Sequence, residues 1–486
     1  MALDTSTTAS SPLPTYLQAA KPNPPSNRAP WYTNTAPTYA GIFLWFVFWD
    51  SIASNGLDIG GLEMALAGVM VGSLICYLLF YLVPGMLGMK TGLPLYIVGT
   101  STFGSIGGLL MPGFLMGLLQ FGWLAVNTCF SSQALLKGFG LNPTGTAYYV
   151  LCVAWAVGAA FVGLKGVQYV AKVATFLPLI PLAVLILALM NFAGSAGSYH
   201  AAPQMKKVNF NEMEVKVAGA DNPLPNLESP FVPWLAMLGM VGHIVGFFAT
   251  AGAAGVDFGM SNRDGRDVRW GGIAGILIAI IFTAGAAVIT VAGARALGVL
   301  QGPDVDGFKV TNALEQKLDK TVFSAIMIGL TLAAFPGACF SSFIAANSFK
   351  TVMPQVNSFV SVGLGALVSI ILAVTRVAEN LPAVFNIIGA SFGPICGAMC
   401  ADYLIARRKW TGPRAGFNPA GWIAWLLGFV VGILPNLFNF AQIKIEVPAA
   451  PVLAFVVGYF VYFLMAKAGM RSRVLPYGPA QQPQTT

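Results

Sequence analysis

The feature that most constrains this chain is a series of uncharged apolar segments, each about 20 residues long, that recurs from residue 39 to residue 467. A helix of about 20 residues spans the roughly 30 Å hydrocarbon core of a bilayer. Only 9% of the 486 residues are charged and 56% are apolar, whereas about 25% of an average soluble domain is charged. The sequence therefore predicts an all-α membrane protein. It excludes a soluble enzyme, a nucleic-acid-binding protein and a disulfide-stapled secreted domain.

About twelve membrane-spanning helices are expected. They fall at residues 39–60, 63–87, 109–136, 146–164, 169–191, 231–256, 271–294, 322–346, 356–375, 382–405, 419–440 and 449–467. An even number of spans places both ends of the chain on one side of the membrane. Most basic residues between the spans lie on that same side, so the positive-inside rule assigns it to the cytoplasm.

The tails and loops follow from this topology. Residues 1–38 are rich in Pro, Ser and Thr and lack the apolar core of a signal peptide, so a disordered cytoplasmic tail is expected there. Residues 468–486 are expected to form a second cytoplasmic tail. Two longer polar loops, at residues 192–230 and 295–321, are expected outside the cell. The protein is thus predicted to reside in the plasma membrane, with lipid around it.

The spans divide into five at residues 39–191, five at 231–405 and two further helices at 419–467. This layout is expected of an inverted repeat in which one helix of each half is discontinuous and the substrate binds between the two. The sequence contains no G-x-x-x-x-G-K-[S/T] loop for ATP. A secondary carrier or a channel is therefore predicted.

Neither a disulfide nor a metal site is expected. All six cysteines lie inside apolar segments, where a thiol behaves as a small hydrophobe. Cys396 and Cys400 have a spacing that suits two metal ligands, but the two histidines, His200 and His243, lie far away in the sequence. No cofactor is predicted apart from a co-transported cation.

The first span contains an acidic residue about half-way along its length. Asp50 lies in YAGIFLWFVFWDSIASNG, and an unpaired charge at such a depth costs roughly 2.5–3.5 kcal/mol. Aromatic residues crowd just before it, and Phe46 and Trp49 are expected to line the substrate site. Asp50 itself either carries the coupling cation or only pairs with a neighbouring helix or with water.

Glycines at 239, 242, 246, 252 and 255 make the sixth span easy to unwind near its middle. Phe247, Phe248 and Thr250 lie at this weak point and are expected at the substrate site. The same glycines also suit close helix packing, which is the alternative. His243 lies in this span, and it either carries a proton or packs as an ordinary buried histidine.

A polar stripe runs along the third span. Gln120, Trp123, Asn127 and Ser131 are spaced by three, four and four residues, which places them on one side of an α-helix. The Trp123 indole offers a stacking plane, and the Asn127 amide offers donors and an acceptor to the edge of a ring. The stripe predicts a site for a flat heteroaromatic ligand, with hydrogen bonding between packed helices as the alternative.

Four stretches resemble the nucleobase-cation-symport-1 family, and within it the purine and cytosine permeases. They are KTG at 90–92, QFGWLAVN at 120–127, FFATAGAAGVDFG at 247–259 and ADYLIARRKW at 401–410. The resemblance covers nearly the whole membrane portion, 39–467. It implies a LeuT-like fold of five plus five inverted-repeat helices with two additional C-terminal helices, which carries a nucleobase or a related ring inward together with a cation.

The resemblance also implies roles for single side chains. A third-span tryptophan of the family stacks on the ring and a polar residue one turn later binds its edge, which implies these roles for Trp123 and Asn127. A sixth-span aromatic residue covers the other face of the ring, which implies Phe248, with Thr250 at a small polar position. These two residues are roughly 200° apart around an intact helix, so both face one ligand only if the helix unwinds there.

The eighth span departs from the family pattern. It has Ala334, Phe335 and Pro336 where sodium-coupled cytosine permeases have hydroxyl residues and an asparagine that binds the base. A hard cation needs oxygen ligands, which the side chains of Ala and Phe lack. Proton coupling through Asp50, with His243 as second choice, is therefore favoured over sodium, and cytosine is not expected to be the best ligand.

The sequence thus predicts a symporter that imports a nucleobase-like ring by alternating access. One alternative is a sodium-coupled carrier of a hydantoin, allantoin or vitamin-precursor ring, and another is a passive channel, which calls for a more polar lining. An intramembrane enzyme would need a nucleophile, a base and a metal set that this sequence does not offer. The expected partners are the small-molecule substrate and membrane lipid, without nucleic acid.

Overall fold

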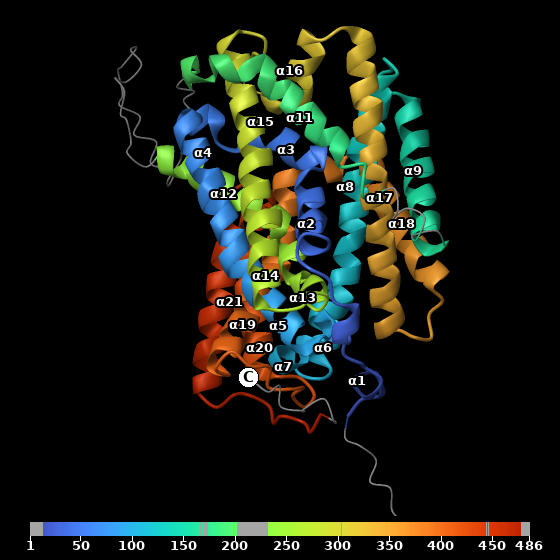
Figure 1. The fold of residues 1–486 in the computed structure, drawn as a ribbon, viewed down its shortest axis with the longest axis vertical. Helices are drawn as coiled ribbons and strands as arrows, with labels where there is room; N and C mark the ends of the chain where they lie inside the picture. Colours follow the sequence, from blue (N-terminus) through green and yellow to red (C-terminus); the bar gives the residue numbers. More distant parts are fainter. Residues whose placement is uncertain are drawn as a thin grey trace, which may run out of the picture.

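The computed structural model is built almost entirely from helices (Figure 1). It describes residues 13–165, 168, 174–201, 232–302, 304–443, 445 and 447–477. Most of the expected loop at 192–230 and the outer parts of both expected tails lie outside the described residues. Helix α1 (Thr15–Gln18) lies at one end of the molecule together with the last described residues, and we call this the terminal end. Helix α16 (Val310–Lys317) lies at the opposite end, the loop end.

Ten helices in the described part of the chain are long and apolar enough to cross a membrane. They are formed by α4 (Leu57–Ile75) with α5 (Leu82–Thr91), α8 (Leu115–Gly138), α9 (Thr146–Lys165), α11 (Leu179–Phe192), α12 (Val232–Ala253), α14 (Gly265–Gly272) with α15 (Ala279–Ala296), α17 (Lys320–Val352), α19 (Leu381–Ile405), α20 (Pro419–Phe440) and α21 (Ala450–Lys467). Helix α18 (Ser358–Val374) is apolar but shorter, and it falls on the expected span at 356–375. The total of twelve spans stays a prediction.

The first span is broken into two short helices, α2 (Thr35–Phe43) and α3 (Phe46–Ile52). Trp45 has an extended backbone, with φ −61° and ψ 124°, so the helical hydrogen bonds stop at this point. The indole N–H of Trp49 donates to the carbonyl oxygen of Leu44 at 3.0 Å. One orphan carbonyl at the end of α2 is thereby paired inside the protein, as a break in a membrane helix requires.

The sixth span breaks later than expected. Helix α12 runs without interruption through Phe247, Phe248 and Thr250, and it is separated from α13 (Gly255–Gly259) by Ala254. The prediction that the helix unwinds around Phe248 is therefore wrong for this structure. The glycines instead allow close packing, because a Cβ at Gly246 would lie 2.8 Å from the carbonyl oxygen of Phe385.

The helices form two groups that meet at the centre of the molecule. Helix α4 packs against α12 and α15, and α8 packs against α9, α17 and α18. Helix α19 contacts α12 on one side and the two last helices, α20 and α21, on the other. Elements from both groups, together with the break in the first span, surround the residues described next.

The segment at residues 13–34 is ordered and packs against the terminal end, which corrects the expectation of a disordered tail at 1–38 for these residues. Leu17 of α1 is buried, with 1% of its surface exposed. The guanidinium of Arg28 donates to the carbonyl oxygen of Met89, near the end of α5, at 2.9 Å. This segment has the composition of a polar tail, but it is held in place by hydrogen bonds to backbone groups, which sequence patterns do not reveal.

Candidate functional site

Four aromatic side chains from four elements meet beside the break of the first span, and we call them the aromatic cluster. They are Trp45 at the break, Trp123 of α8, Phe247 of α12 and Phe385 of α19. The Trp123 ring centroid lies 6.0 Å from that of Trp45, 5.3 Å from that of Phe247 and 5.8 Å from that of Phe385. Phe247 also contacts Trp45 and Phe385, at 6.3 Å and 5.5 Å. Helices from both groups thus bring aromatic rings together at a single point, in edge-on or tilted contacts.

The side of α12 that meets the cluster carries Phe247 and Thr250, which are three residues apart. The indole N–H of Trp123 donates to Thr250 Oγ1 at 3.1 Å. Phe248 is fully buried on another side of α12, where its ring stacks on Phe43 of α2 at 5.6 Å. Because α12 stays intact, Phe247 and not Phe248 shares the Trp123 side with Thr250.

The aromatic residues of α3 are buried next to the cluster. Phe46 and Trp49 are both buried, and the indole N–H of Trp49 is engaged at the helix break. Phe48 reaches the cluster itself, because its ring centroid lies 4.6 Å from that of Phe247. In this geometry α3 supports the cluster more through Phe48 than through the two residues expected there.

The amide of Asn127 is occupied by neighbouring helices. Its Nδ2–H donates to the carbonyl oxygen of Ala334 in α17 at 3.0 Å, and its Oδ1 accepts from the indole N–H of Trp155 in α9 at 3.0 Å. Ser131 donates to the same oxygen at 3.2 Å. Gln120, one turn before Trp123, donates to the sulfur of Met116 in its own helix. In this structure, therefore, Asn127 makes the interhelical hydrogen bonds that the sequence left open as the alternative.

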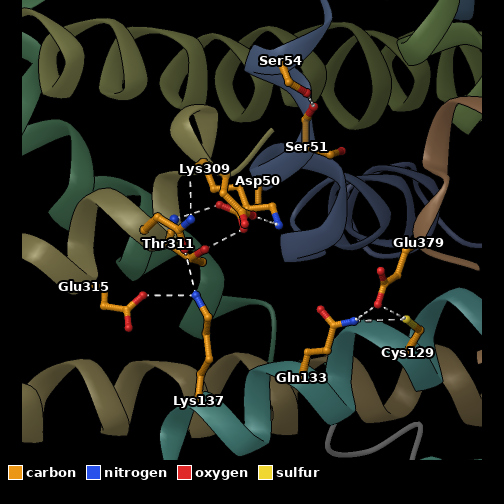
Figure 2. A network of polar contacts seen from close by, with 12 residues as sticks. Asp50, Ser51, Ser54, Cys129, Gln133, Lys137, Lys309, Thr311, Glu315 and Glu379 are labelled. Atoms are coloured by element: carbon orange, nitrogen blue, oxygen red, sulfur yellow. Dashed lines mark hydrogen bonds and ion pairs between the residues drawn. The ribbon is translucent and has the colours of Figure 1, made fainter. Parts of the chain in front are cut away.

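Asp50 bonds to the loop-end segment between α15 and α17. Its Oδ1 accepts from the backbone N–H of Thr311 at 2.8 Å, and its Oδ2 lies 2.7 Å from the Thr311 hydroxyl (Figure 2). The side chain of Asp50 is buried, with 9% of the residue exposed. Thr311 lies in the first turn of α16, whose free N–H groups favour a carboxylate. Asp50 therefore fastens the first span to α16.

Helix α16 is also fastened to α8. The ammonium of Lys137 donates to Asn312 Oδ1 at 2.9 Å and lies 3.1 Å from Glu315 Oε2 (Figure 2). Next to α16, Lys309 forms an ion pair with Asp306 at 2.7 Å. The hydrogen bond from Lys309 holds the pKa of the Asp306 carboxyl below its usual range. These contacts and the Asp50–Thr311 bonds form what we call the loop-end network, which ties α16 to the first span and to α8.

His243 lies between α3 and the aromatic cluster. Its Nε2 lies 3.1 Å from Ser51 Oγ, and its ring packs edge-on against Phe385 at 4.7 Å. Its Nδ1 and the indole nitrogen of Trp45 are buried atoms without a hydrogen-bond partner among the described residues. Both unpaired atoms therefore belong to residues that touch the cluster.

Trp45, Phe385 and Thr311 carry no sequence signal that singles them out. Trp45 is one of 10 tryptophans and Phe385 is one of 34 phenylalanines. Thr311 lies in a polar loop whose sequence has no periodicity. Its closeness to Asp50 depends on a contact between residues 261 positions apart. Among the residues that the structure describes, no three His, Cys, Asp or Glu side chains converge as metal ligands.

Comparison with known proteins gives one family and one fold. The model of a family described as permeases for cytosine/purines, uracil, thiamine and allantoin matches residues 22–462. No curated protein sequence matches the chain. A closed structure of Mhp1, a nucleobase-cation-symport-1 family transporter with bromovinylhydantoin bound, superposes with a TM-score of 0.61 at 16% identity, covering 95% of each chain.

Two further structures share the architecture. The inward-facing conformation of Mhp1 gives a TM-score of 0.57 at 18% identity, over 93% of this chain and 94% of that one. A Na⁺-coupled sialic acid symporter gives 0.53 at 13% identity, over 93% and 92%. The chain thus has the LeuT-like transporter fold that the sequence predicts, whereas its division into five plus five plus two helices stays a prediction.

Proposed function

Because the chain belongs to the family of permeases for cytosine/purines, uracil, thiamine and allantoin, we propose that it imports a nucleobase or a related small heteroaromatic ring by proton-coupled alternating access. Membership in this family makes the protein a membrane transporter and not an enzyme. The proposed location is the cell membrane, with both termini in the cytoplasm. The loop end then faces the outside, where the substrate enters.

The observation that carries this proposal is the aromatic cluster. A flat ring that takes up a position against Trp123 and Phe247 gains stacking and edge contacts from both. The cluster lies where the break of the first span meets α8, α12 and α19, as a midplane site between the two halves of an inverted repeat does. We propose Trp123 as the stacking residue, Phe247 as the residue opposite it, and Thr250 and Phe48 as their supports.

The remaining expected site residues have supporting roles in this proposal. Phe248 and Phe46 hold the helices that carry the cluster, and Trp49 holds the break of the first span. Asn127 keeps α8 in register with α17 and α9, so its effect on the ligand passes through Trp123, one turn away. Gln120 lies on the same side of α8 and is left with its carbonyl oxygen for a polar ligand edge.

Asp50 is the proposed carrier of the coupled proton. The N–H of Thr311 only donates, whereas its hydroxyl both donates and accepts, so Thr311 pairs with either protonation form of Asp50. When α16 moves away, Asp50 loses both partners, and a proton from outside then neutralises the unpaired carboxylate, because an unpaired charge inside the membrane is costly. The ammonium groups that face this site, Lys309 and Lys137, each have acidic partners of their own.

Support for protons over sodium comes from α17. Ala334 and Phe335 lack side-chain oxygens, and the carbonyl oxygen of Ala334 accepts a hydrogen bond from Asn127. The hydroxyl of Thr331 donates to the carbonyl oxygen of Met327 at 2.8 Å. A sodium ion needs several free oxygen ligands, and at these residues the oxygens are missing or engaged.

The test is uptake by the purified protein in liposomes. The panel contains purines, pyrimidines, hydantoin, allantoin and vitamin precursors, each offered with a pH gradient or a sodium gradient imposed separately. We expect at least one ring to accumulate above equilibrium when the outside is more acidic and sodium is equal on both sides. Accumulation driven by sodium at equal pH would support the sodium-coupled carrier instead. Uptake that only equilibrates would support a channel, and uptake of no ring would refute the substrate class.

A further inference from the structure

Two buried polar atoms beside the aromatic cluster have no protein partner in the part of the chain that the structure describes. They are the indole Nε1 of Trp45 and Nδ1 of His243. Buried polar atoms in proteins are paired in the great majority of cases, so each exception calls for an explanation. One explanation is a ligand that supplies the missing partner.

The neighbourhood of His243 defines the hydrogen-bonding sense of its free nitrogen. We assign the single proton of Ser51 Oγ to the carbonyl oxygen of Val47 at 2.8 Å, because this oxygen, like that of Phe48 at 3.1 Å, only accepts. The same hydroxyl then accepts from His243 Nε2–H, at 3.1 Å. In neutral imidazole one nitrogen carries the proton and the other is a bare acceptor, so this network assigns the acceptor to Nδ1.

Trp45 has the opposite sense, because an indole nitrogen only donates. The other indoles around the cluster have used their N–H groups. That of Trp123 donates to Thr250, that of Trp49 to Leu44 and that of Trp155 to Asn127. Trp45 is thus the tryptophan of the cluster whose indole N–H has no partner in the described part of the chain.

The free donor and the free acceptor belong to residues that contact the same group of rings. Trp45 contacts Trp123 and Phe247, whereas His243 contacts Phe385, which in turn contacts Trp123 and Phe247. A ring that replaces part of this aromatic contact would therefore lie next to both Trp45 and His243. Asn127, the amide one turn after Trp123 in α8, has its own partners.

We propose that Trp45 and His243 select the ligand by its two edges: the N–H of Trp45 donates to a ring carbonyl oxygen, and Nδ1 of His243 accepts from a ring N–H. The ligand class is then an uncharged ring with both groups, a cyclic amide or imide. This inference rests on the proposed function, because it needs a ring at Trp123. It assigns His243 to ligand binding, and Asp50 remains the proposed coupling residue.

Binding of three matched pairs of rings to the purified protein, measured by calorimetry, tests this inference. The pairs are uracil and 1,3-dimethyluracil, hydantoin and 1,3-dimethylhydantoin, and xanthine and its 1,3,7-trimethyl derivative. Methylation removes the N–H donors and keeps the carbonyl oxygens. In the parent protein we expect the unmethylated ring of the best-binding pair to bind about tenfold more tightly, as one lost hydrogen bond to a buried acceptor allows.

Variants separate the two edges. His243→Leu removes the acceptor and should reduce the preference for the unmethylated ring to less than about threefold, whereas His243→Asn keeps an acceptor and should keep the preference. Trp45→Phe keeps an aromatic ring and loses the donor, so both members of a pair should weaken by a similar factor of about five. The matched control is Trp425→Phe, which removes an indole N–H that donates to Ser391 away from the cluster and should leave all affinities unchanged.

Two results would overturn the inference while leaving the proposed function standing. One is a parent protein that binds a ring but binds its methylated partner equally well. The other is a preference that is the same in the parent and in His243→Leu. If the parent binds none of the six rings and takes up no ring from the wider panel, the proposed function itself fails.

Discussion

The aromatic cluster and the loop-end network lie close together on the first span, but they differ in whether their buried polar groups have hydrogen-bond partners. At the cluster, Trp45 and His243 each have a buried polar atom without a partner among the described residues. At the loop end, Asp50 has a partner for each of its oxygens, and both come from Thr311. In the proposed function a ligand supplies the partners that the cluster lacks, whereas the network has its partners within the protein. In the proposed function, this difference distinguishes the site that binds the substrate from the contact that closes the loop end.

One short helix connects the two regions. In α3, Asp50 bonds to α16 and the next residue, Ser51, bonds to His243 of α12. A displacement of α16 that pulls on Asp50 therefore also changes the contact of Ser51 with the residues around the cluster. In the proposed mechanism, closure of the loop end and occupation of the cluster are linked in this way through Asp50 and Ser51.

The largest effect is expected at the cluster. Trp123→Ala removes the plane on which the ligand stacks, and stacking of a base on an aromatic side chain contributes about 1–3 kcal/mol. Binding of the best ring should weaken by one to two orders of magnitude or be lost. Calorimetry measures this, with Trp123→Phe expected to keep most of the affinity. Unchanged affinity in Trp123→Ala would place the ligand elsewhere.

The next effect is a loss of coupling without a loss of binding. Asp50→Asn keeps an acceptor for the N–H of Thr311 and a polar group opposite its hydroxyl, but it cannot exchange a proton. Accumulation driven by a pH gradient should cease, while exchange of labelled ring for unlabelled ring across the membrane should continue. Both are measured in the same liposomes. Undiminished proton-driven accumulation in Asp50→Asn would remove this residue from the coupling.

A smaller effect is expected from weakening the closure alone. Thr311→Val removes the hydroxyl contact with Asp50 and keeps the shape of the side chain, at a cost of about 1 kcal/mol. Helix α16 should then open more often, so its amide hydrogens should exchange with deuterium about fivefold faster. Thr311→Ser keeps the hydroxyl and serves as the control. Equal exchange in both variants would mean that the hydroxyl does not hold the loop.

The smallest effect concerns Asp306, whose pKa is lowered by the hydrogen bond from Lys309. A carboxyl with a lowered pKa in the folded state adds stability above its unfolded pKa, and this contribution is lost only as the pH falls through the lower folded value. The ion pair is therefore intact throughout pH 5 to 8. Hydrogen exchange of α16 in Asp306→Asn should show the same pH dependence as the parent in this range. A pH dependence that disappears in the variant would contradict this assignment.

The fold is readable from the sequence because its signals are local. Apolar segments long enough to span a bilayer, separated by polar loops, predict most of the observed helices directly. The inverted-repeat layout predicts that the first span is discontinuous. The position of the break at Trp45 depends on a hydrogen bond from Trp49, which the periodicity of the sequence does not encode. The ordered segment at 13–34 was missed for the same reason, because backbone contacts between distant residues leave no pattern in composition.

The site is readable only in part, because helix faces depend on where helices bend. An unwound sixth span would turn Phe248 and Thr250 to one ligand, but α12 is intact and turns Phe247 to Trp123 instead. The spacing of Trp123 and Asn127 fixes their common side of α8, yet it does not reveal that the amide already has partners in α9 and α17. The partner of Asp50 is 261 residues away and lies beyond any local argument.

The most direct test of the central claim compares two neighbouring phenylalanines. Phe247→Leu and Phe248→Leu each replace an aromatic face by an aliphatic side chain, so both keep much of the buried apolar volume. The affinity of the best-binding ring, measured by calorimetry, should fall by about tenfold in Phe247→Leu and by less than about threefold in Phe248→Leu. A large loss in Phe248→Leu with little change in Phe247→Leu would contradict the proposed site and mean that the ligand meets the other side of α12.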